Sequence, residues 1–94
     1  MNKEQINLVT KLKESNTTKK NLLKAVEEFQ ELSLILTQRI NKGKFIKDFK
    51  IIEEIGDCEI RLEVLKQLFN RKKISKRIDN KLKRIVVNKI GNGE

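Results

Sequence analysis

The chain of 94 residues contains no histidine, proline, tryptophan or tyrosine, and it has a single cysteine, Cys58. Zinc sites with nitrogen and sulfur ligands and catalysis by a Ser-His or Cys-His pair both need side chains that are missing here. Cys58 also has no second cysteine with which to form an internal disulfide. Any chemistry must therefore depend on carboxylates, lysines and arginines.

Long apolar runs are also missing. No segment approaches the roughly 20 consecutive apolar residues that a membrane-spanning helix requires, and the N-terminus lacks the apolar stretch of a secretory signal. We therefore expect a cytoplasmic protein without a membrane partner.

The composition favours helix throughout. Proline is absent, only four glycines occur, and the chain is rich in Lys, Leu, Ile and Glu. We expect one all-α domain over residues 1–94. A chain of this length has little room for a large self-contained core, so we also expect a homodimer or homotetramer.

Apolar residues at helical spacing predict four helices, over residues 3–14, from the capping segment 15–18 to about 41, over 44–70, and from 74 to about 90. Gly43 is predicted to end the second helix, and residues 91–94 are expected to fray. The third helix is expected to bury a row of apolar residues: Phe45, Phe49, Ile52, Ile55, Cys58, Leu62, Leu65 and Phe69.

Two acidic clusters lie on the two central helices. Glu28 and Glu31 are three residues apart, as are Glu54 and Asp57, so each pair projects from one face of its helix. Four converging carboxylates repel one another unless a cation neutralises them, and an all-oxygen site suits Mg2+ or Mn2+. The spacing therefore favours a metal site between the two helices.

An alternative is that these acids are surface charges paired with local bases. Lys24 with Glu28, Lys50 with Glu54, and Arg61 with Asp57 have suitable spacing, and such pairs contribute about 0.3 to 0.5 kcal/mol each. Spacing alone leaves both interpretations open. However, both acidic pairs border apolar stripes, where a carboxylate needs a cation or a hydrogen-bond donor.

Gly56 lies within the second acidic cluster. Glycine inside a helix costs about 1 kcal/mol relative to alanine and offers no packing of its own. We expect another helix or a ligand to approach closely there, which would put the second cluster at an interface.

These residues resemble a known family. The segment 27–32 (EEFQEL) and the segment 54–57 (EIGD) resemble the ExxE and ExxD motifs of the MazG-like all-α nucleoside triphosphate pyrophosphohydrolases. Residues 59–69 are similar to the small members of the family, which are often encoded by phages. The resemblance covers about residues 21–84, which is most of the chain.

The resemblance implies a four-helix bundle completed by oligomerisation. It also implies an enzyme that hydrolyses a nucleoside triphosphate to the monophosphate and pyrophosphate, with Mg2+, or Mn2+ in its place, as cofactor. The catalytic metal ligands would be four residues: Glu28, Glu31, Glu54 and Asp57. Glu27 and Glu53 match acids that often precede these ligands and would orient or deprotonate the attacking water.

The family's third motif, an Asn followed by a Lys two positions later, is altered. Residues 79–84 (DNKLKR) resemble it, and Lys81 and Arg84 would bind phosphate oxygens. Asp79 stands where the Asn is expected unless the register moves to Asn80. A protein of the same fold that binds nucleotide or a partner without turnover therefore remains an alternative.

The charge of the chain suggests a second alternative. A net charge of +9, from 22 basic and 13 acidic residues, is typical of proteins that contact phosphate-bearing partners, so a basic helical nucleic-acid-binding protein is also considered. The chain lacks a recognisable helix-turn-helix, basic zipper or finger signature, and the basic residues have no aromatic residues interleaved among them. The pyrophosphohydrolase is therefore the preferred interpretation.

Overall fold

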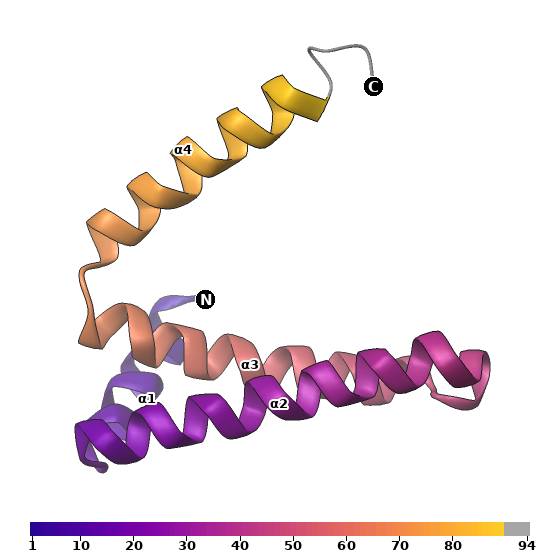
Figure 1. Ribbon diagram of the computed structural model, residues 1–94. Coiled ribbons are helices and arrows are strands. Elements are labelled where there is room, and N and C mark those ends of the chain that lie inside the picture. The colour runs from indigo at the N-terminus through magenta and orange to yellow at the C-terminus, as the bar shows by residue number, and fades with distance from the viewer. Residues whose placement is uncertain (90–94) are drawn as a thin grey trace.

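The computed structural model describes residues 1–89, and it is all-helical (Figure 1). The elements are α1 (Lys3–Glu14), α2 (Thr18–Lys42), a 3-10 turn η1 (Gly43–Phe45), α3 (Asp48–Leu68) and α4 (Arg71–Lys89). The predicted all-α class is confirmed. The predictions for Ile90 and for residues 91–94 lie outside the described residues. Within residues 1–89, no helix is both long and apolar enough to cross a membrane.

Side-chain caps explain where the first two helices begin. The Asn2 side chain accepts a hydrogen bond from the backbone N–H of Gln5, and the Gln5 side chain accepts one from the Asn2 N–H, which makes a capping box. The Thr17 hydroxyl accepts the N–H of Lys20 at 3.1 Å. The predicted range of α1 and the predicted capping segment before α2 are both confirmed.

Helices α2 and α3 form a long antiparallel hairpin (Figure 1). Gly43 ends α2 with a φ of 59°, as predicted, because glycine adopts positive φ without steric cost. Across the turn, the Arg39 guanidinium donates to Asp48 at 2.7 Å and to the Ile46 carbonyl at 3.1 Å. Because the chain passes through η1 and an extended Ile46 first, α3 begins at Asp48 and not near residue 44 as predicted.

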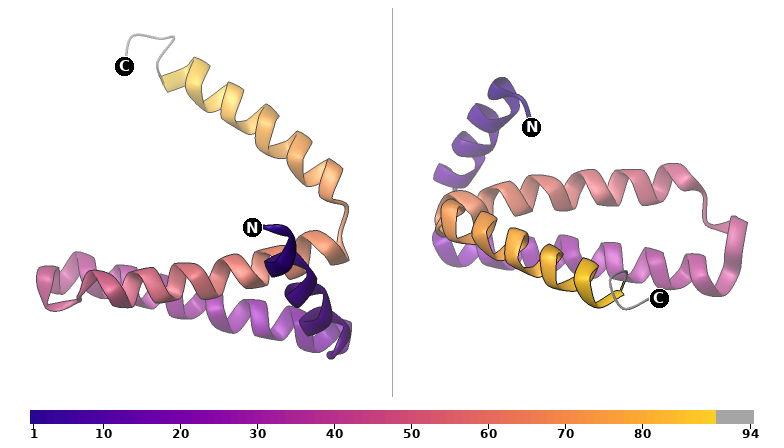
Figure 2. Two further views of the ribbon diagram at one scale, coloured as in Figure 1. Left: turned by 180° about the vertical axis from the view of Figure 1, so that it is seen from behind. Right: turned by 90° about the horizontal axis from the view of Figure 1, so that it is seen from above.

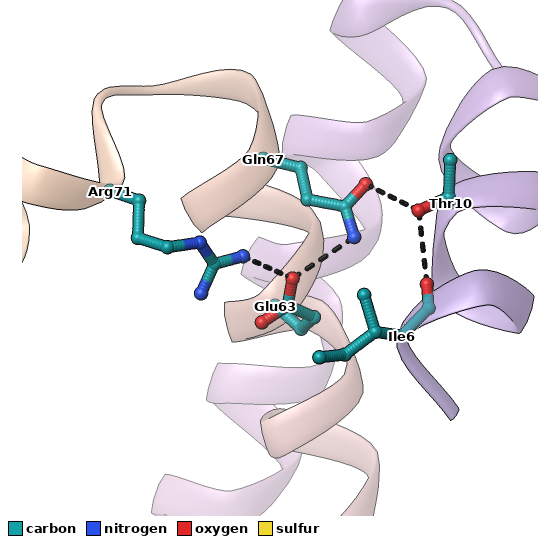
Figure 3. A network of polar contacts seen from close by, with 5 residues as sticks. All are labelled: Ile6, Thr10, Glu63, Gln67 and Arg71. Atoms are coloured by element: carbon teal, nitrogen blue, oxygen red, sulfur yellow. Dashed lines mark hydrogen bonds and ion pairs between the residues drawn. The ribbon is translucent and has the colours of Figure 1, made fainter. Parts of the chain in front are cut away.

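A polar network joins α1, α3 and the start of α4 (Figure 3). The buried Glu63 carboxylate accepts hydrogen bonds from Gln67 at 3.0 Å and from Arg71. The Gln67 side-chain oxygen lies 3.0 Å from the Thr10 hydroxyl on α1. Glu63 therefore links the first residue of α4 to α3.

Helix α4 extends away from the hairpin, and the views in Figure 2 agree on this arrangement. None of its residues is buried. It begins at Arg71 and not at 74 as predicted, so the basic segment 71–73 forms its first turn. Within one chain, the predicted four-helix bundle is not closed.

The core of a single chain is small. The buried apolar residues are Val9, Ala25, Cys58 and Val64. Most of the row predicted to be buried on the third helix is exposed, and Phe45, at 88% exposure, is the extreme case. The prediction was wrong because helical periodicity identifies an apolar face but does not reveal whether the same chain covers it.

Candidate metal centre

The hairpin brings the two acidic clusters together. Because α2 and α3 are antiparallel, Glu28 lies opposite the segment that carries Glu54 and Asp57. One carboxylate oxygen from each of these three residues lies within 4.8 Å of the others. Glu28 and Glu54 are half-buried, whereas Asp57 is exposed. The three side chains therefore converge on one position between the helices.

Glu31 is the fourth predicted ligand, and it stands one turn beyond Glu28 on α2. Desolvation raises the pKa of Glu28 and that of Glu54 most, and the charge of the nearby Glu31 carboxylate raises both further. Glu31 itself is exposed. The structure thus places all four predicted acids in one neighbourhood, with Glu31 at its rim.

The electrostatics of the cluster are unfavourable without a counter-charge. Desolvation is the largest cause of a raised pKa at Glu28, followed by the charges of Glu31 and Asp57. The pKa of Glu54 is raised for the same reasons in the same order. A raised carboxyl pKa means that the protein disfavours the ionised form, so a cation between these groups would be strongly attracted.

Two oxygens in the cluster have no partner. Oε2 of Glu28 and Oε2 of Glu54 are both buried, and neither accepts a hydrogen bond. Buried carboxylate oxygens in proteins normally have a donor or a metal. Their chemistry, together with Asp57 and Glu31, fits a hard divalent cation with oxygen ligands such as Mg2+ or Mn2+.

The local ion pairs that would explain the acids as surface charges are absent from residues 1–89. Lys24 pairs with Glu27 at 3.2 Å and not with Glu28. Lys50 pairs with Glu53 at 3.8 Å and not with Glu54. The third pair, Arg61 with Asp57, does not form either. The bases thus pair with the outer acids Glu27 and Glu53, and the four inner acids remain without a basic partner.

A sulfur contact lies beside the cluster. The Cys58 thiol donates to the backbone carbonyl of Glu28 at 3.2 Å, and burial raises the pKa of this thiol. The sequence suggested that Cys58 is buried, but it gave no sign of this contact. The only signal available was that Cys58 directly follows Asp57.

Lys81 and Arg84, the predicted phosphate-binding residues, are not near the acids in one chain. Both are exposed on α4, which leaves the hairpin (Figure 1). Neither forms an ion pair with a residue in the described part of the chain. Nearby, Asp79 pairs with Lys83 at 3.1 Å.

Gly56 was predicted to mark a close approach. A Cβ atom built at this residue would meet no other atom within 4 Å. Within the chain this prediction was therefore wrong.

In the comparisons with known proteins, no protein-family model, curated protein or solved structure matched the chain.

Proposed function

We propose that this protein is a Mg2+-dependent nucleoside triphosphate pyrophosphohydrolase that releases pyrophosphate and a nucleoside monophosphate. One observation carries the proposal. Glu28, Glu54 and Asp57 converge within 4.8 Å, and no basic residue of the described chain neutralises them. Such a site suits a divalent cation and the polyphosphate that accompanies it.

The proposal gives separate roles to the inner and outer acids, as the resemblance implies. Four residues would hold the cation: Glu28, Glu31, Glu54 and Asp57. When bound, the cation would neutralise triphosphate oxygens and activate water near neutral pH. Glu27 and Glu53 are exposed beside the cluster, and there they would accept a proton from the attacking water. No covalent nucleophile is required.

The remaining parts of the proposal come from the resemblance and the composition. Lys81 and Arg84 would hold phosphate oxygens as charged donors. The protein would act on the nucleotide pool in the cytoplasm, in a phage-related setting, as a homodimer or homotetramer. Because α4 extends away from its own hairpin (Figure 2), the basic pair would have to reach the substrate through assembly or through movement of α4.

The test is pyrophosphate release from a panel of canonical and modified nucleoside triphosphates with Mg2+. We expect Glu31→Gln and Asp57→Asn to reduce turnover at least 100-fold, because each removes a ligand charge. Glu14→Gln is the matched control, since Glu14 is an exposed acid at the end of α1. The absence of release from every nucleotide by the wild type would contradict the proposal.

A binding protein of the same fold is the second candidate, and the altered third motif favours it. If the protein only binds, Mg2+ and a non-hydrolysable triphosphate should bind to the wild type while no pyrophosphate is released. Binding by isothermal calorimetry, combined with the release assay, separates the two candidates.

The third candidate, a nucleic-acid-binding protein, is favoured by the charge of α4. This exposed helix carries nine Lys and Arg side chains and one acid, Asp79. It predicts binding to DNA or RNA that weakens steeply with salt and is unchanged in Asp57→Asn. Fluorescence anisotropy over a salt series tests this prediction.

A further inference from the structure

An exposed apolar row runs along α2. At about 100° of rotation per residue, the residues that face α3, such as the buried Asn21 and Ala25, define one side of the helix. A second row lies about 60° to 140° round the helix from Asn21, in the direction in which the chain turns. Its apolar members are at least partly exposed: Leu22, Val26, Phe29, Leu36 and Ile40.

Helix α3 carries a matching row. Relative to the buried Cys58, which faces α2, Ile52, Ile55 and Leu62 are rotated in the same sense, and all three are exposed. In an antiparallel pair, rows displaced in the same rotational sense lie on the same side of the hairpin. The two rows therefore form one surface, here called the apolar face.

The acidic cluster opens on the other side of the hairpin. Glu31 on α2 and Asp57 on α3 are rotated from the contact line in the sense opposite to the apolar face, and both are exposed. A partner on the apolar face would consequently leave these carboxylates accessible.

Helix α4 starts on the side of the apolar face. Glu63, which pairs with Arg71 at the first residue of α4, is displaced round α3 in the same sense as Ile52. From there α4 extends outward (Figure 2) and presents its own exposed apolar row of Ile78, Leu82 and Ile85. A partner bound to the apolar face would therefore also contact α4.

The chain exposes more surface than a compact monomer of its mass, and the excess is large enough for a dimer interface. The chain exposes 7600 Å², whereas a compact monomer of 11.0 kDa would expose about 5600 Å². The radius of gyration is 16.4 Å, against about 12.4 Å for a compact chain of this length. The excess of about 2000 Å² per chain is more than each partner buries in a stable interface of standard size, about 600 to 1000 Å².

We propose that a second copy of this chain covers the apolar face, related to the first by a twofold axis, with α4 of each copy packed against its partner. A twofold interface uses the same patch on both copies. Electrostatics are compatible with this location, because most of the nine basic residues of α4 lie away from its apolar row, and the hairpin part of the face carries opposite charges at Glu59 and Lys66. The inference rests on the homodimer of the proposed function and names its interface, and it does not depend on the hydrolase chemistry.

Sedimentation equilibrium and light scattering test the proposal without nucleotide or metal. The wild type should have about twice the chain mass of 11.0 kDa. Leu36→Glu places a charge on the apolar face and should give monomers. Leu34→Glu is the matched control on the same helix, because Leu34 points away from both α3 and the apolar face yet is more exposed, at 59% against 42%. It should remain a dimer.

A second pair of variants, with alanine in place of glutamate, tests the proposal if Leu36→Glu does not fold. Leu36→Ala should raise the dimer dissociation constant at least tenfold, because the side chain is buried twice in a twofold interface, and Leu34→Ala should leave it within twofold. Circular dichroism checks that helix content is kept. A monomeric wild type at 100 μM, or equal effects at both positions, would overturn the proposal.

Discussion

The Cys58 thiol on α3 donates a hydrogen bond to the backbone carbonyl of Glu28 on α2, with Sγ and O 3.2 Å apart. This contact marks the level at which the two helices lie against each other. At this level Glu54, one turn before Cys58, and Asp57, its direct neighbour, meet Glu28. The acids therefore come together through packing between helices, at a cost in charge repulsion that the single chain does not offset.

That repulsion gives a pH dependence whose sign can be stated. The pKa of Glu28 and that of Glu54 are raised above the ordinary value of 4.5, so the folded protein binds protons here more tightly than the unfolded chain. This contribution to stability is present at low pH and is lost as the pH rises from 4.5 through the raised values. Glu63 acts in the opposite direction, because Arg71 lowers its pKa, and its contribution is lost on acidification.

Glu54→Gln should therefore stabilise the protein at pH 7.5 in EDTA and flatten the loss of stability above pH 4.5. Thermal unfolding followed by circular dichroism between pH 4 and 8 measures both effects. Glu14→Gln, outside the cluster, is the matched control. A lower melting temperature for Glu54→Gln at pH 7.5 would show that the cluster is not repulsive in the metal-free protein.

Divalent cations should stabilise the wild type. A ligand at 100 times its dissociation constant that binds only the folded state adds about 2.7 kcal/mol, which raises the melting temperature of a domain of this size by roughly 10 °C or more. Mg2+ and Mn2+ should have this effect, whereas Asp57→Asn should show less than half of it. An equal rise in NaCl of matched ionic strength would indicate general screening and no site.

Much of the fold could be predicted from the sequence because its signals are local. The Asn2 and Thr17 caps, the positive φ of Gly43 and helical periodicity together define the helices. The start of α3 was missed because the turn 43–47 contains a 3-10 segment that periodicity does not distinguish from α-helix.

Predictions of ion-pair partners and of burial were less accurate, because they depend on which neighbouring residue makes the contact. Lys24 can reach either Glu27 or Glu28, because residues three and four positions away are equally near on a helix. The structure contains the pair with Glu27. The convergence of Glu28 with Glu54 was predictable in outline from matching positions on two helices. The exposure of Phe45 and of most of its row was not predictable, because burial depends on what lies opposite.

Gly56→Ala should stabilise the protein by about 0.5 to 1 kcal/mol. A Cβ at this position meets nothing within 4 Å, so alanine gains helix propensity without a clash. Chemical denaturation at fixed protein concentration measures the change. A loss of stability would mean that a second molecule approaches Gly56, as the sequence first suggested, and sedimentation of the variant would locate the effect in assembly.

Arg71 and Glu63 should respond unequally to truncation, although they form one ion pair. Arg71→Ala leaves the Glu63 carboxylate, 8% exposed, with only the Gln67 amide as donor; this should cost about 2 to 3 kcal/mol. Glu63→Gln leaves a guanidinium that is 51% exposed and free to turn to water, so it should cost about 1 kcal/mol. Urea denaturation of both variants at pH 7 measures the difference. Equal losses would mean that the pair acts mainly by orienting α4, because the same orientation would be lost whichever partner is removed.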